Sequence, residues 1–228
     1  MIKSFPPVIL GSSPFTNSPQ LKKDYTCFEN NPDAIYQVLV MAVRCGCVGF
    51  HCFPDVVVVD VFKKLKLDYP HIVIIGTIGF GGKLMEQVEN LSILQVDGIM
   101  LHSSIVDVAP TKYLAAIYNL LNDRNISLGF STNNILQSRI LFDYGFSFAM
   151  TPINMMGYHM EPSREEVLDL LPHIKETIIG MQVIASGRLD WKTAILWASR
   201  HVRHMVLGIG NPDNVNKSIS YAMACLKD

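Results

Sequence analysis

Two histidines, His51 and His102, each stand at the end of a short run of apolar residues. An imidazole titrates close to neutral pH, so it can transfer a proton or donate a hydrogen bond to a reacting group. Three histidines could instead hold a divalent metal, with His159 as the third. No carboxylate is obviously placed with these three residues. We therefore expect His51 and His102 to act as an acid–base or hydrogen-bonding pair and predict no metal site.

Small polar residues follow several of the other apolar runs. Their hydroxyl and amide groups can orient a small ligand by hydrogen bonds. A polar loop needs no ligand, because turns and loops are in general rich in such residues. The pattern carries weight because it recurs after successive runs. We expect three of these residues to contact a ligand or cofactor: Ser131, Asn154 and Ser186.

Glycines mark two further junctions, ASGRL (185–189) and LGIGNPDNV (207–215), each lying between an apolar run and a helical pattern. Glycine allows a ligand to approach the backbone closely, and the N–H groups at a helix start attract anions. A helix entrance without a ligand explains the second segment equally well, with Asn211 as cap and Pro212 at the first helical position. The ligand hypothesis places a phosphate against four residues: Gly187, Gly208, Gly210 and Asn211.

The elements that must position these residues form a repeated couplet of a β-branched run, a turn and an amphipathic stretch. Strands are predicted over residues 8–13, 47–52, 72–78, 96–102, 126–131, 146–153, 180–186 and 203–209. Helices are predicted over residues 33–44, 57–66, 83–91, 111–121, 134–144, 162–174, 191–201 and 212–226.

Eight couplets without an interruption are the number that a (β/α)8 barrel requires. The nearly continuous apolar strands are typical of a parallel sheet covered by helices. We therefore predict an α/β chain whose residues 1–228 form one compact TIM barrel. An open, doubly wound sheet is the structural alternative, because it uses the same βαβ units. In a barrel, all of the candidate residues gather at the carboxyl ends of the strands.

The composition excludes several classes of protein. The chain has 228 residues, of which 49% are hydrophobic and 17% are charged, and its formal net charge is -1. Disordered chains combine low hydrophobicity with high charge, and nucleic-acid binders carry a basic excess. The sequence has neither property. The predicted partner is a small molecule, with no nucleic acid and no membrane, and homo-oligomer formation stays open.

The five cysteines do not form the pattern of a secreted disulfide framework. The apolar stretch at the start of the chain is too short for a signal peptide and is interrupted by Pro6 and Pro7. No apolar run reaches the ~18 residues of a membrane helix. We therefore expect a cytoplasmic protein.

Several strand ends resemble those of the aldo-keto reductases, a superfamily of NADP-linked oxidoreductases with a (β/α)8 barrel. The resemblance covers roughly the second half of the chain. It rests on DGIMLH (97–102), LGFSTN (128–133), TPINMM (151–156), GMQVIASG (180–187) and VLGIGN (206–211), with a weaker likeness at LGSS (10–13). It implies carbonyl reduction with NADP(H), with Ser131 and Asn154 near the nicotinamide and the last loop near the cofactor phosphates.

The family's reaction uses an Asp, Tyr, Lys and His tetrad, and the resemblance places its histidine at His102. The other three members do not appear at matching positions. The second strand reads GFHCFP (49–54), and Ile78 stands roughly where the lysine is expected. Without the tyrosine, the family's usual proton donor is missing, so we do not expect the ordinary reductase chemistry even if the fold is the same. Tyr158 or Tyr25 could supply a phenol instead, but nothing in the sequence places either of them at the site.

Three functions remain open from the sequence. The first is a divergent barrel that binds or converts a small carbonyl-containing or phosphorylated metabolite, as an NAD(P)-linked oxidoreductase. In that function His102 donates a proton or polarises the carbonyl, and His51 is its partner. The second is a cofactor-free isomerase or lyase that acts on a phosphorylated metabolite. The third is a barrel that binds a metabolite without catalysis.

Overall fold

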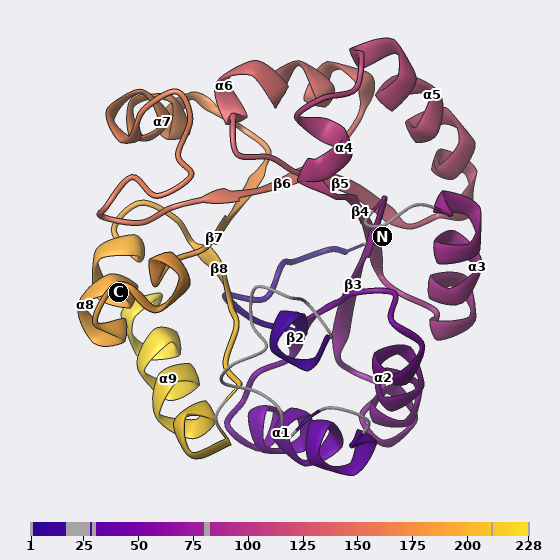
Figure 1. The fold of residues 1–228 in the computed structure, drawn as a ribbon, viewed down its shortest axis with the longest axis vertical. Coiled ribbons are helices and arrows are strands. Elements are labelled where there is room, and N and C mark those ends of the chain that lie inside the picture. Colours follow the sequence, from indigo (N-terminus) through magenta and orange to yellow (C-terminus); the bar gives the residue numbers. More distant parts are fainter. Residues whose placement is uncertain (1, 17–27, 29–30, 80–82, 211, 228) are drawn as a thin grey trace.

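The structure is a computed structural model, and it describes residues 2–16, 28, 31–79, 83–210 and 212–227. Within these residues, eight parallel strands close into a barrel, in which each strand pairs with the next and β8 pairs with β1 (Figure 1). This confirms the predicted (β/α)8 fold and excludes the open sheet. The strands are β1 (Val8–Gly11), β2 (Gly49–Cys52), β3 (Val73–Ile78), β4 (Gly98–Leu101), β5 (Ser127–Ser131), β6 (Phe148–Pro152), β7 (Thr177–Met181) and β8 (His204–Leu207).

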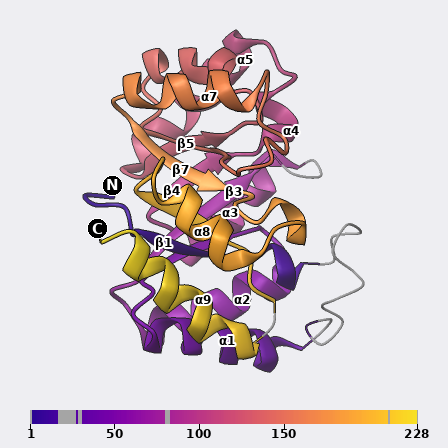
Figure 2. The ribbon, with the colours of Figure 1, turned by 90° about the vertical axis from the view of Figure 1, so that its left-hand side faces the viewer.

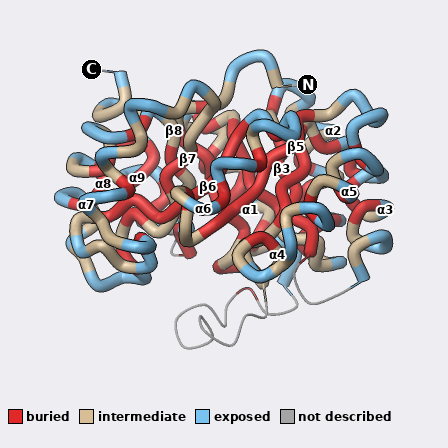
Figure 3. Tube along the Cα trace, turned by 90° about the horizontal axis from the view of Figure 1, so that it is seen from above, coloured by how far each residue is buried: buried red, intermediate tan, exposed pale blue. Residues whose placement is uncertain are grey.

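Helices surround the barrel, and their outer sides are exposed while the strands inside are buried (Figure 3). The α-helices are α1 (Pro32–Arg44), α2 (Val56–Asp68), α3 (Leu84–Leu94), α4 (Ser103–Val106), α5 (Thr111–Leu121), α6 (Ile135–Ser138), α7 (Arg164–Leu170), α8 (Trp191–Ala198) and α9 (Pro212–Cys225). None of the described helices is long and apolar enough to cross a membrane.

Local signals start several of these helices where the sequence predicts them. The Asp55 carboxylate accepts hydrogen bonds from the first N–H groups of α2, and the Asp190 carboxylate does the same for α8. Ser163 and Glu166 bond to each other at the start of α7. Such caps satisfy N–H groups that have no partner within the helix. At α2, α7 and α8, the cap therefore marks the boundary between the helix and the loop that leads from the preceding strand.

The seventh strand differs from its prediction. It runs from Thr177 to Met181 instead of over residues 180–186, because Gln182 takes a left-handed conformation with φ 52° and ends the strand. The predicted strand begins at Gly180, whereas in the structure this residue lies inside β7. A Cβ there would lie 3.0 Å from the Val202 side chain, so close packing explains the glycine. Residues 134–144 also differ, because they form the short α6 and then a 3-10 helix, η4 (Arg139–Tyr144).

Alternate strand residues fill the inside of the barrel. The buried interior cluster consists of Ile9, Ile75, Met100, Phe148, Met150 and Ile179. The intervening residues pack outward against the helices, as Phe50 does against Phe62 of α2 with ring centroids 5.9 Å apart. Since side chains alternate along a strand, His51 and Thr77 share the inward face with Ile75.

The amino-terminal segment, residues 2–7, closes one end of the barrel. The Ile2 N–H donates to Ser127 Oγ at 2.8 Å, and the Met205 N–H donates to the Pro7 carbonyl at 2.9 Å. The Phe5 ring lies 5.0 Å from that of Phe148 in the interior cluster. All three contacts involve the first residues of a strand. The segment therefore covers the end opposite to the one where the candidate residues lie, on the side of the two chain termini (Figure 2).

Candidate active site at the carboxyl ends of the strands

His51 lies in β2, with its side chain inside the barrel and only 6% exposed. Its Nε2 shares a hydrogen bond with the Thr77 hydroxyl of β3. Burial, and secondarily the nearby His102, lowers the pKa of His51 to about 3. The ring is therefore neutral at physiological pH, and it cannot deliver a proton as an imidazolium.

His102 follows β4 directly and caps α4. Its Nδ1 accepts a hydrogen bond from the Ser104 N–H at 3.1 Å and also lies 2.8 Å from Ser104 Oγ. Because a backbone N–H can only donate, Nδ1 carries no proton in this arrangement, and the neutral ring holds its proton on Nε2. Burial lowers the pKa of His102 below its usual 6.5, and the Asp107 carboxylate opposes this shift.

The Phe53 ring joins the two histidines. Its centroid lies 5.0 Å from that of His51 and 6.0 Å from that of His102. The Phe53 N–H donates to Ser12 Oγ at 2.9 Å, and the Ser12 N–H donates to the His51 carbonyl at 3.0 Å. The structure thus brings the two predicted histidines together around an aromatic ring. Sequence reasoning did not find Phe53, whose signal was only its place two residues after His51.

Asp107 is a second residue that sequence reasoning missed. Its carboxylate accepts hydrogen bonds from the Thr132 hydroxyl at 2.5 Å, the Asn133 N–H at 3.1 Å and the Asn133 side-chain amide at 3.0 Å. It thereby ties the turn after α4 to the end of β5 and places a negative charge near His102. No carboxylate adjoins His102 in the sequence, because Asp107 lies five residues further along.

Ser131 and Asn154 are both at the predicted strand ends, but their polar atoms bond to neighbouring backbone. Ser131 Oγ accepts from the Ser103 N–H at 2.9 Å, which holds the start of α4. Asn154 is fully buried, and its side chain bonds to both the N–H and the carbonyl of Tyr158, at 2.8 and 2.9 Å. Both residues thus shape the loops around the site.

Ser186 and Gly187 lie in the loop after β7, five and six residues beyond the strand end, in a 3-10 turn, η6 (Ala185–Gly187). Both are exposed. The Ala185 and Gly187 N–H groups bond to carbonyls within the same loop. Beside the turn, the Arg188 guanidinium lies over the Tyr158 ring at 4.4 Å and donates to the Ala185 carbonyl at 3.1 Å. The Arg188 guanidinium therefore places a positive charge beside this loop.

The loop after β8 is exposed at Gly208 and buried at Gly210. A Cβ at Gly208 would meet Pro14 only at an ordinary 3.6 Å, so the backbone there is open. Asn211, the fourth residue of the predicted phosphate site, lies outside the described residues.

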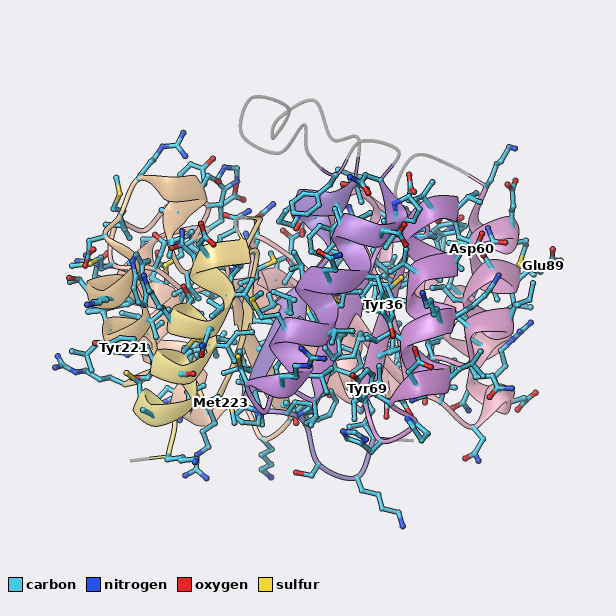
Figure 4. All side chains as sticks on the ribbon, turned by 90° about the horizontal axis from the view of Figure 1, so that it is seen from below. Tyr36, Asp60, Tyr69, Glu89, Tyr221 and Met223 are labelled. Carbon is cyan, nitrogen blue, oxygen red and sulfur yellow. The ribbon has the colours of Figure 1, made fainter. Side chains whose placement is uncertain are left out.

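A groove of about 510 Å³ lies between α8 and α9. It is lined by two lysines, two aromatic residues and an amide: Lys192, Lys217, Trp191, Tyr221 and Asn214. The Trp191 and Tyr221 rings meet edge to face at 5.6 Å, and Figure 4 shows Tyr221 of α9 on the outer side of the molecule. The sequence analysis did not identify Trp191 as a binding residue. The groove depends on two helices whose contact the sequence does not show.

His159 does not join the other two histidines. It is exposed, and its ring lies 4.1 Å from that of Tyr158 in the loop after β6. In the described part of the chain, no group of three or more His, Cys, Asp or Glu side chains is placed to hold a metal ion.

No family model matches the sequence, and no curated protein matches it in sequence. The fold, by contrast, is similar to known structures. A Pseudomonas aeruginosa protein, PA4992, described as an aldo-keto reductase, has 18% identity and a TM-score of 0.74 over 96% of this chain and 90% of its own.

Two further structures are similar over most of their length. A glycerol dehydrogenase from Gluconobacter oxydans has 13% identity and a TM-score of 0.72, over 100% of this chain and 92% of its own. A variant of Gox0644 in complex with NADPH has 14% identity and a TM-score of 0.67, over 98% and 89%. The chain described here therefore has the (β/α)8 barrel fold of the aldo-keto reductases.

Proposed function

We propose that the chain is an NADP(H)-linked oxidoreductase that interconverts a small carbonyl compound and its alcohol, with His102 in place of the usual tyrosine. The observation that carries this proposal is the state of His102, a half-buried ring at a strand end whose proton is held on Nε2 by the Ser104 N–H. An N–H of that kind can polarise a carbonyl oxygen.

The residues that line the groove between α8 and α9 fit the adenosine end of such a cofactor. Lys192 and Lys217 supply positive charge for phosphate, and Trp191 and Tyr221 supply aromatic surface for a base. The loop after β8 has open backbone at Gly208, and we propose that the pyrophosphate lies against this loop, at Gly208 and Gly210. Under the proposal, Ser186 and Gly187 contact the same cofactor, and the predicted contact of Asn211 falls on a residue outside the described part of the chain.

The reaction adds one hydride to the carbonyl carbon and one proton to its oxygen. The reduced nicotinamide, when bound, supplies the hydride. His102 in its protonated form gives the Nε2 proton to the oxygen and becomes neutral, and solvent then returns a proton to the ring. His51 stays neutral throughout, because its pKa is too low for it to act as the acid. Its bond to Thr77 keeps the interior beside Phe53 in place.

The differences from the aldo-keto reductase tetrad agree with this assignment. Ile78, which stands roughly where the family has lysine, is the last residue of β3 and is fully buried. It carries no charge that could lower the pKa of a phenol. The mechanism proposed here therefore uses a histidine as its acid.

Cofactor binding is tested by titrating the protein with NADPH and following its fluorescence and the melting temperature. We expect stabilisation, and we expect the double variant Lys192→Ala/Lys217→Ala to bind at least tenfold more weakly, because it removes both positive charges of the groove. Lys112→Ala on α5 is the matched control, an exposed lysine away from the groove. No shift with NADPH, together with stabilisation by sugar phosphates, would instead indicate a cofactor-free enzyme.

Turnover is tested with a panel of small aldehydes and ketones, following the loss of NADPH absorbance. His102→Phe keeps a planar ring and removes both nitrogens. We expect it to lower kcat/KM by at least a hundredfold with little change in the NADPH dissociation constant. Unchanged turnover in this variant would contradict the role of His102.

A further inference from the structure

Ser104 contacts His102 through two different groups on the same ring nitrogen. Its backbone N–H donates to His102 Nδ1 at 3.1 Å, and its hydroxyl oxygen lies 2.8 Å from that nitrogen. The hydroxyl also donates to the Gly79 carbonyl at 3.2 Å. The N–H alone is enough to cap α4, so the capping role leaves the position of the hydroxyl unexplained.

The two groups suit two different states of the ring. When Nδ1 is unprotonated, it accepts from the Ser104 N–H. When Nδ1 carries a proton, the N–H can no longer donate to it, but the hydroxyl oxygen can accept that proton at the same place. The hydroxyl hydrogen is then directed to Gly79, which satisfies the serine in turn.

We propose that Ser104 is a positioning residue whose hydroxyl lets His102 change its protonation state without losing its hydrogen bond. The proposal rests on the role of His102 under the proposed function. When the imidazolium gives its Nε2 proton to a substrate oxygen, the neutral ring that first remains carries its hydrogen on Nδ1, which is the opposite tautomer to the resting one in which Nδ1 accepts from the Ser104 N–H. Ser104 Oγ accepts from Nδ1–H both before and after that transfer, so the ring does not rotate during the step.

Three other groups that the structure describes near the ring do not replace this function. Asp107 acts on His102 through charge, and its carboxylate oxygens bond to Thr132 and Asn133. His51 is neutral, and its Nε2 is bonded to Thr77. Phe53 presents a ring, which is not an acceptor for Nδ1–H at this position. Among these neighbours, Ser104 Oγ is the acceptor at hydrogen-bond distance from Nδ1.

The test is an NMR titration of the His102 ring in the full chain without cofactor. Ser104→Ala keeps the backbone N–H and removes the acceptor for Nδ1–H. We expect its His102 pKa to be about one pH unit lower than that of the unaltered chain, a tenfold weaker protonation, because a hydrogen bond to a charged group is lost. Ser104→Thr keeps a hydroxyl and is expected to keep the original pKa.

Ser103→Ala is the matched control, since it removes the neighbouring hydroxyl, and its His102 pKa should not move. Ser104→Cys provides a second variant with a weak acceptor, for which we expect a pKa between those of serine and alanine. An equal His102 pKa in Ser104→Ala, Ser104→Cys and the unaltered chain would overturn the proposal.

The titration separates this inference from the proposed function, because it needs neither NADPH nor substrate. A lowered pKa without NADPH binding would retain the role of Ser104 and reject the reductase. NADPH-dependent turnover with an unmoved pKa would do the reverse. If both hold, the pH profile of carbonyl reduction should shift to lower pH in Ser104→Ala and return in Ser104→Thr.

Discussion

At the scale of single residues, His51 and His102 differ because of their surroundings. His51 is enclosed in the barrel interior, and desolvation lowers its pKa to about 3. His102 is only half-buried. Burial lowers its pKa and the Asp107 carboxylate opposes this shift, so its protonation is less disfavoured than that of His51. The same residue type therefore serves as a fixed neutral hydrogen-bonding group in β2 and as a candidate acid at the end of β4.

The low pKa of His51 predicts how stability depends on pH. Below pH 6.5 the unfolded chain binds a proton at this residue and the folded chain does not, so stability falls as the pH falls towards 3. From pH 7 to pH 5 we expect the free energy of unfolding to fall by about 2 kcal/mol more in the unaltered chain than in His51→Asn. Urea denaturation of both proteins at the two pH values measures this difference, and parallel losses would contradict it.

At the scale of elements, the loops at the carboxyl ends are held by polar side chains, and the sequence had suggested two of them, Ser131 and Asn154, as ligand contacts. Ser131 holds the start of α4, Asp107 holds the end of β5, and Asn154 holds the loop after β6. A buried backbone group must find a partner, and in an irregular loop a side chain supplies it. These polar residues therefore place the site, while His102 is the residue that we expect to touch a substrate.

Asn154 gives a test at this scale. Asn154→Ala leaves the Tyr158 N–H and carbonyl without their partner, and we expect it to lower the free energy of unfolding by about 2 kcal/mol. It should also loosen the stacking of Arg188 on Tyr158. Urea denaturation measures the first effect. Asn216→Ala, on the exposed side of α9, is the control and should change stability by less than about 0.5 kcal/mol.

At the scale of the whole molecule, the barrel has a site end and a closed end. The carboxyl ends carry the histidines and the loops, while residues 2–7 cover the other end against Phe148 and the first residues of β5 and β8. In a barrel of this kind, packing at the closed end stabilises the fold, and the catalytic residues lie at the opposite end. A change at one end should therefore leave the function of the other largely intact.

Phe5→Ala tests this separation. The Phe5 ring is half-buried against Phe148, so its removal should lower the free energy of unfolding by about 2 kcal/mol. Because Phe5 lies at the closed end, we expect NADPH binding per folded molecule to be unchanged. A loss of NADPH affinity in a folded Phe5→Ala protein would show that the two ends are coupled.

The sequence by itself was sufficient for the barrel, because strand and helix periodicity is a local property that repeats eight times along the chain. It also placed His51 and His102 at the ends of two strands, the second and the fourth. It misplaced β7, because it used Gly180 to mark the start of the strand. The glycine is instead explained by the close packing of the Val202 and Ile153 side chains, which come from elsewhere in the chain. Local patterns do not contain such contacts.

Only the tertiary structure decided what each polar group does. The partners of Asn154, Asp107 and Ser104 depend on loop conformation, and the burial that sets the protonation of His51 depends on residues distant in sequence. The helices α8 and α9 lie side by side (Figure 2). The groove between them likewise exists only once the two helices are packed. Periodicity follows from the nearest residues along the chain, whereas hydrogen-bond partners and desolvation follow from neighbours in space.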